Sequence, residues 1–152
     1  MLIELEIAYD SKEAVKISDM LGEFIYKHAL DTSKELARTR GTFRDYHEGY
    51  GYEPRRNILL LSIAPTASIS NIAGTSSCIE PYYANVYSRE TTSGKFTIVV
   101  KQLINELKAN GLWNEEIKNK IIEYSGSVQF IPELDGVIDK SIYKTVYESD
   151  PL

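Results

Sequence analysis

Apolar and polar positions alternate along the chain with two different periods, and each period predicts a different kind of element. Over residues 10–40 the apolar side chains recur every three or four positions, which predicts one long helix. Asp10 and Glu13 stand three residues apart at its start, as in a capping box, and Gly41 supplies the stop. Such a helix would extend for about 45 Å.

A continuous apolar run over residues 57–64, Asn-Ile-Leu-Leu-Leu-Ser-Ile-Ala, predicts a buried strand that has a neighbour on each side. The run breaks at Pro65, and a hydroxyl-rich turn with a short helix follows over residues 65–74, where Gly74 supplies the stop. The preceding segment, residues 41–56, holds three glycines and a proline and is predicted to be a long loop.

Strand and helix signals continue in the second half of the chain. Residues 82–100 are predicted to form a hairpin around the turn Thr91-Thr92-Ser93-Gly94. Helical periodicity returns over residues 102–109 and 114–125, and Asn114 is placed to cap the second of these helices. Because the predicted strand expects neighbours on both sides and the chain ends straight after a helix, we expect a piece of a larger α/β protein.

Length and composition fit one globular domain, with 152 residues, 43% of them hydrophobic and 26% charged. The net charge of −5 argues against a nucleic-acid partner, because such proteins present a basic face. No apolar run is long enough to span a membrane and the N-terminus carries no basic signal region, so no membrane partner is expected. The single cysteine, Cys78, fits a reducing cytosol, and a cytoplasmic protein is predicted.

The familiar catalytic signatures are missing from the sequence. Gly49-Tyr50-Gly51 begins a dinucleotide-binding pattern, but Pro54 stands where the third glycine belongs, and there is no P-loop motif. The two histidines and Cys78 lack the spacing of metal ligands, so no metal site is predicted. No Gly-x-Ser-x-Gly elbow is present to carry a serine nucleophile.

The remaining candidate site is the turn after the predicted strand, with the sequence Pro-Thr-Ala-Ser-Ile-Ser. Its three alternating hydroxyls, on Thr66, Ser68 and Ser70, exceed the single side chain that a helix cap uses. Hydroxyls and free backbone N–H groups at a strand-to-helix turn can hold a phosphate without lysine or arginine. The alternative is an ordinary Ser-capped helix, since serine and threonine are preferred caps with or without a ligand.

Around this turn the chain resembles the large subunit of ribonucleotide reductase, in many separate blocks that occur in the family's order. The matching blocks are residues 56–57, 65–70, 72–77, 79–81, 85–89, 93–96, 111–116, 126–129, 131–132 and 143–148. Most of them are similar to class I, diphosphate-reducing enzymes, and the block 72–77 is also similar to cobalamin-dependent, class II enzymes. The resemblance covers nearly the whole chain, residues 1–152.

The resemblance implies both a fold and a role. In the family this region belongs to the second half of a ten-stranded α/β barrel, so the chain is expected to be a single barrel fragment with a long N-terminal helix. The family's Pro-Thr-x-Ser-x-Ser turn cradles the phosphates of the substrate. Carried over, the hydroxyls of Thr66, Ser68 and Ser70 and the N–H groups of Ala67 and Ile69 would bind the phosphates of a ribonucleoside diphosphate in deoxyribonucleotide synthesis.

The family's catalytic parts are absent from these 152 residues. The radical-carrying cysteine of the family lies in an Asn-x-Cys-x-Glu finger loop, and no such motif occurs here. Cys78 does not match any of the family's catalytic cysteines, so no catalytic residue is assigned. The loop over 41–56 is also expected to be shorter than the family's usual connection. By itself the chain is not expected to reduce a ribonucleotide.

The missing parts imply partners. The chain would need a complementary large-subunit chain that carries the finger loop and, in a class I enzyme, a radical-generating small subunit. The radical source, a small-subunit cofactor or adenosylcobalamin, would lie outside this chain. The alternative hypothesis is a non-catalytic remnant, or a regulatory module that binds phosphate or a nucleotide.

Overall fold

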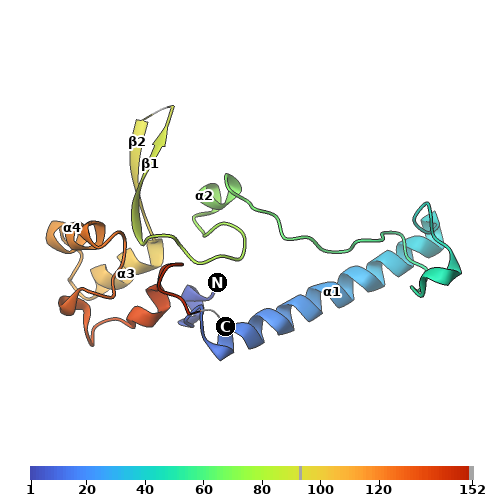
Figure 1. Ribbon diagram of the computed structural model, residues 1–152, viewed down its shortest axis with the longest axis horizontal. Coiled ribbons are helices and arrows are strands. Elements are labelled where there is room, and N and C mark those ends of the chain that lie inside the picture. The colour runs from blue at the N-terminus through green and yellow to red at the C-terminus, as the bar shows by residue number, and fades with distance from the viewer. Residues whose placement is uncertain (93, 151–152) are drawn as a thin grey trace. The chain divides into compact units, whose positions relative to one another are not determined.

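The computed structural model describes residues 1–92 and 94–150 (Figure 1). Contacts divide the chain into two compact units. The first combines Met1–Ala14 with Pro65–Leu152, and the second is Val15–Ala64. The candidate turn belongs to the first unit, so that unit positions the site.

The first unit contains helices and one small sheet. Its elements in chain order are η1 (Ile3–Leu5), α2 (Ile69–Ala73), β1 (Val86–Thr91), β2 (Gly94–Val99), α3 (Lys101–Ala109), α4 (Glu115–Glu123), η3 (Pro132–Leu134) and η4 (Lys140–Tyr143). β1 and β2 form an antiparallel hairpin whose register runs from Val86 opposite Val99 to Thr91 opposite Gly94. Ser93, which the sequence places in the turn, lies outside the described residues.

The core of the first unit lies between the base of the hairpin and the two helices that follow it. Leu103 and Leu107 are fully buried one helical turn apart on α3, as are Ile117 and Ile121 on α4. Trp113 packs against this core from the loop between the helices. The other buried hydrophobic residues of the cluster are Val86, Val100, Val128, Ile131, Leu134, Ile138, Ile142 and Tyr143.

Local capping sets the ends of α4. The Asn114 side chain accepts a hydrogen bond of 2.9 Å from the N–H of Ile117, which makes it the cap that the sequence predicts. After the helix, Gly126 has a φ of +87° and donates from its N–H to the Ile121 carbonyl at 2.7 Å.

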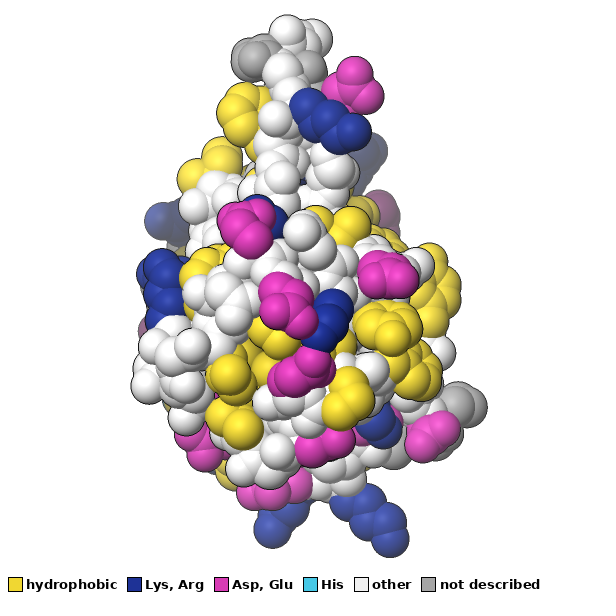
Figure 2. Space-filling model, turned by 90° about the vertical axis from the view of Figure 1, so that its left-hand side faces the viewer, with side chains coloured by type: hydrophobic (Ala, Val, Ile, Leu, Met, Phe, Trp, Pro, Cys, Tyr) yellow, Lys and Arg dark blue, Asp and Glu magenta, His cyan; other side chains and the backbone are white. Residues whose placement is uncertain are grey.

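Figure 2 shows a face of this unit on which hydrophobic side chains lie among acidic and basic ones.

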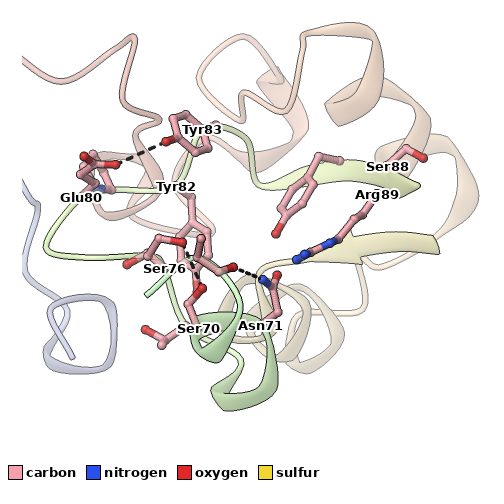
Figure 3. A pocket seen from close by; sticks show the side chains of 13 residues that line it. Ser70, Asn71, Ser76, Glu80, Tyr82, Tyr83, Ser88 and Arg89 are labelled. Atoms are coloured by element: carbon pink, nitrogen blue, oxygen red, sulfur yellow. Dashed lines mark hydrogen bonds between the residues drawn. The ribbon is translucent and has the colours of Figure 1, made fainter. Parts of the chain in front are cut away.

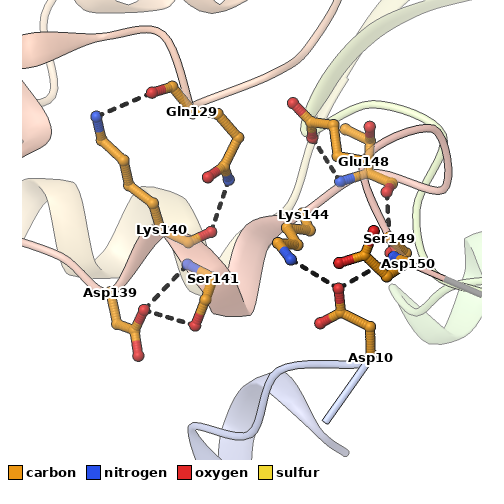
Figure 4. A network of polar contacts seen from close by, with 10 residues as sticks. Asp10, Gln129, Asp139, Lys140, Ser141, Lys144, Glu148, Ser149 and Asp150 are labelled. Atoms are coloured by element: carbon orange, nitrogen blue, oxygen red, sulfur yellow. Dashed lines mark hydrogen bonds and ion pairs between the residues drawn. The ribbon is translucent and has the colours of Figure 1, made fainter. Parts of the chain in front are cut away.

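The capping box predicted at Asp10 is not formed. Ser11 is the cap instead, because its hydroxyl accepts from the N–H of Ala14 at 3.0 Å. The Asp10 carboxylate is taken up by two distant partners, the Lys144 ammonium at 2.7 Å and the backbone N–H of Asp150 at 3.2 Å (Figure 4). The hydrogen bond from Lys144 lowers the pKa of Asp10 below its usual value.

The second unit holds most of α1 (Lys12–Arg40) and the loop that follows it, with the short η2 (Glu48–Tyr50). Gly41 ends α1 with a φ of +79° and an N–H bonded to the Ala37 carbonyl at 3.0 Å. The loop then returns along the helix. Asn57 donates from its backbone N–H to the Ser33 hydroxyl at 2.9 Å, and this hydroxyl donates to the Asn57 side-chain oxygen at 3.3 Å.

The strand predicted over residues 57–64 is not a strand in the structure. Among the described residues the only sheet is the β1–β2 hairpin, so no neighbour is present to pair with this segment. A strand needs such a partner for its N–H and C=O groups, whatever its side chains favour. Its apolar side chains are accordingly open to solvent, with Leu59 at 82% and Ile63 at 67% of full exposure.

Candidate functional site

The candidate turn begins with a threonine in an unusual conformation. Thr66 has a φ of +50°, in the left-handed region that residues with a branched Cβ rarely adopt. Two hydrogen bonds hold it there. The Thr66 hydroxyl accepts from the backbone N–H of Cys78 at 2.9 Å, and its carbonyl accepts from the N–H of Ser70 at 2.9 Å. Thr66 therefore joins the turn to the segment that follows α2.

Ser70 makes a second link to the same segment. Its side chain is buried, and its hydroxyl lies 3.0 Å from that of Ser77. Its carbonyl accepts from the N–H of Thr75 at 3.0 Å, just after Gly74 ends the helix with a φ of +67°. Two of the three predicted phosphate-binding hydroxyls thus have partners within the chain.

The middle of the turn faces outward. Ala67, Ser68 and Ile69 are exposed, and Ser68 makes no capping hydrogen bond with its side chain. Their three backbone N–H groups have no acceptor among the described residues. Ser68 is the N-cap of α2 and Ile69 is its first residue, so their N–H groups are among those that a helix leaves unpaired. The Ser68 hydroxyl and these N–H groups are therefore available to an external acceptor.

An open pocket of about 360 Å³ adjoins the turn (Figure 3). Ala67, Ser70 and Asn71 form one wall of it, and Tyr87 and Arg89 of β1 form another. The remaining lining residues are Thr75, Ser76, Ser77, Glu80, Pro81, Tyr82, Tyr83 and Ser88. Arg89 is a pocket residue that could not be predicted from the sequence, because nothing in the local pattern indicates that the hairpin folds beside the turn.

Two tyrosines that line this pocket, Tyr82 and Tyr83, have raised pKa values. The Tyr83 hydroxyl donates to Glu80 at 3.3 Å, and the Glu80 charge raises the pKa of Tyr83 above its ordinary value. Burial raises the pKa of Tyr82. Both rings therefore offer hydroxyl donors rather than phenolate anions.

The described residues contain no group of side chains that suggests a metal centre. No cluster of three or more His, Cys, Asp or Glu side chains could hold a metal ion there. Cys78 is half-buried, and its backbone N–H donates a hydrogen bond to the Thr66 hydroxyl of the turn. Within residues 1–92 and 94–150, no helix is long and apolar enough to cross a bilayer.

Comparison with known protein families shows the family to which the chain belongs. The family model "Ribonucleotide reductase, barrel domain" matches residues 1–55 and 50–152, two segments that meet in the loop after α1. The chain belongs to the ribonucleotide reductase barrel-domain family.

Curated relatives in this family are about one-third identical to the chain. It is 35% identical to the ribonucleoside-diphosphate reductase large chain of Schizosaccharomyces pombe, with 95% of this chain and 21% of the relative aligned. It is 36% identical to the ribonucleoside-diphosphate reductase large subunit of Danio rerio, with 96% of this chain and 22% of that relative aligned. The chain therefore spans about a fifth of the length of these relatives.

A solved structure agrees with this assignment. The Actinobacillus ureae class Id ribonucleotide reductase alpha subunit superposes with a TM-score of 0.78 at 33% identity, over 95% of this chain and 25% of that one. The structure is thus part of a ribonucleotide reductase barrel domain, built from helices and a two-stranded sheet in the residues described.

Proposed function

We propose that this chain is the portion of a ribonucleoside-diphosphate reductase large subunit that binds the phosphates of the substrate. The exposed middle of the turn is the observation that carries the proposal, since Ala67, Ser68 and Ile69 are exposed and the Ser68 side chain makes no capping hydrogen bond. Thr66 and Ser70 remain part of the proposed phosphate site, and both also make contacts within the chain. Their hydroxyls hold the shape of the turn through Cys78 and Ser77.

Catalysis requires a complementary large-subunit chain that carries the Asn-x-Cys-x-Glu finger loop. The 152 residues contain one cysteine and no such motif. The segment 57–64 also exposes apolar side chains and pairs with no strand among the described residues, and a second chain could provide such a strand. Paired on both sides, this segment would become one strand of the ten-stranded barrel.

The other partners follow from the same proposal. The substrate is a ribonucleoside diphosphate, and the radical comes from a radical-generating small subunit in a class I enzyme or from adenosylcobalamin in a class II enzyme. The radical cofactor lies outside this chain. A non-catalytic binding module is the competing function, and it would bind the diphosphate tightly without any complementary chain.

Replacing Ser68 with alanine tests the phosphate-binding turn. In the assembled subunit, Ser68→Ala should weaken ribonucleoside-diphosphate binding by about 10- to 100-fold, because a hydrogen bond to a charged group is worth roughly 1.5–3 kcal/mol. Ser68→Thr keeps the hydroxyl and should bind within a few-fold of the parent protein. Equilibrium dialysis measures both dissociation constants. Equal affinity of the alanine variant and the parent would contradict the role of the turn.

A further inference from the structure

Arg89 brings a positive charge to the pocket beside the turn. It lies in the middle of β1, opposite Phe96 of β2, and is half-buried. Tyr87 and Arg89 are two residues apart, so they share one face of the strand, and both line the pocket. Figure 3 shows the Arg89 side chain extending from the strand toward the end of the pocket where Asn71 lies. The hairpin therefore holds the guanidinium toward the same space that Ala67 and Ser70 border.

This charge has no counter-ion in the described part of the chain. None of the ion pairs there includes Arg89, and no aromatic ring lies under its guanidinium. The one acid that lines the pocket, Glu80, lies on the opposite side of it in Figure 3 and accepts from Tyr83. A half-buried arginine with free donors is suited to a planar, bidentate acceptor such as a phosphoryl group.

The turn itself lacks any charge of this kind. Hydroxyls and N–H groups can orient phosphoryl oxygens, but a diphosphate carries at least two negative charges, which these neutral groups do not offset. We propose that Arg89 is a further substrate-binding residue, which contacts the phosphoryl oxygens of a ribonucleoside diphosphate held by the turn at residues 66–70. The inference rests on the proposed function of that turn.

The test compares Arg89 with a second cation on the same hairpin. Lys95 is exposed on β2 and does not line the pocket, so Lys95→Gln removes the same charge without touching the site. Pyrophosphate is the probe, added to the full chain, and isothermal titration calorimetry measures its dissociation constant. Arg89→Gln should weaken binding by about 10-fold or more, and Lys95→Gln by less than about 2-fold.

Two further measurements separate binding from folding. Arg89→Lys keeps the charge but loses the planar fork, so its affinity should fall between those of the parent and Arg89→Gln. Fluorescence of Trp113, the single tryptophan, should report the same unfolding midpoint for all these variants. In the parent, pyrophosphate should shift the Arg89 Nε–H signal in an NMR titration.

The outcomes distinguish this inference from the proposal on which it rests. Equal weakening by Arg89→Gln and Lys95→Gln, or no weakening by either, would overturn the role of Arg89. Loss of affinity in both Arg89→Gln and Ser68→Ala would support the inference, whereas loss in Arg89→Gln alone would overturn it, because the turn would then not hold the phosphate that Arg89 contacts. A parent chain that does not bind pyrophosphate would also overturn the inference, whereas the proposed function would still be decided by the assembled enzyme.

Discussion

Replacing Gly126 with alanine should destabilise the first unit by about 3 kcal/mol or more, since a steric clash is added to backbone strain. A Cβ at this position would lie 2.2 Å from the Ala84 Cβ and 2.7 Å from the Ala84 Cα. Neither atom belongs to a flexible side chain, so the backbone itself would have to shift. Such a loss is a large fraction of the stability of a domain of this size.

Gly111 provides the matched control for this substitution. Its φ of +69° is also left-handed, but a Cβ added there would meet nothing within 4 Å. Gly111→Ala should therefore cost only the backbone term, about 1 kcal/mol. Urea denaturation followed by Trp113 fluorescence measures both free energies of unfolding. If the two variants lose the same stability, the close contact between Gly126 and Ala84 is not present in solution.

Replacing Asn85 with alanine should give the second large loss of stability. This side chain is buried and donates to the carbonyls of Gly126 at 3.0 Å and Tyr143 at 2.8 Å. Its backbone N–H also donates to Gly126 at 2.9 Å, and its carbonyl accepts from Val100 at 3.0 Å. Asn85 thus joins the base of the hairpin to two distant segments of the chain.

The expected cost of Asn85→Ala is about 2–4 kcal/mol, because truncation removes two hydrogen bonds and leaves the Tyr143 carbonyl without this donor, while the Gly126 carbonyl keeps the backbone N–H of residue 85. Asn110 is the control, since its exposed side chain also donates to a carbonyl, that of Glu106, at 2.9 Å. Asn110→Ala should cost less than about 1 kcal/mol, because water can replace its bond. Thermal unfolding monitored by Trp113 separates the two cases. Similar melting temperatures for both variants would contradict the role assigned to Asn85.

Elements that depend on local rules coincide with the sequence prediction. The Asn114 cap, the glycine stop after α1 and the hairpin each follow from residues that are near in sequence. Local patterns could not foresee distant partners. Asp10 looks like a helix cap, but the ammonium of Lys144, 134 residues away, competes for its carboxylate.

In the candidate site, too, nearby residues predicted the turn, whereas distant partners could not be predicted. Three alternating hydroxyls drew attention to the turn, and their spacing said nothing about which of them would face outward. Long-range bonds to Cys78 and Ser77 engage Thr66 and Ser70, whereas Ser68 remains exposed. The apolar run over 57–64 likewise has the local pattern of a strand, but it pairs with no strand among the described residues.

The central claim is that this chain supplies the phosphate-binding portion of a large subunit whose chemistry resides in another chain. The most direct test mixes it with a complementary large-subunit chain that carries the Asn-x-Cys-x-Glu loop, adds the small subunit, and measures reduction of a ribonucleoside diphosphate. Neither large-subunit chain should give product alone, and the mixture should form a complex that yields the deoxyribonucleotide. A mixture that forms no complex and no product would contradict the claim.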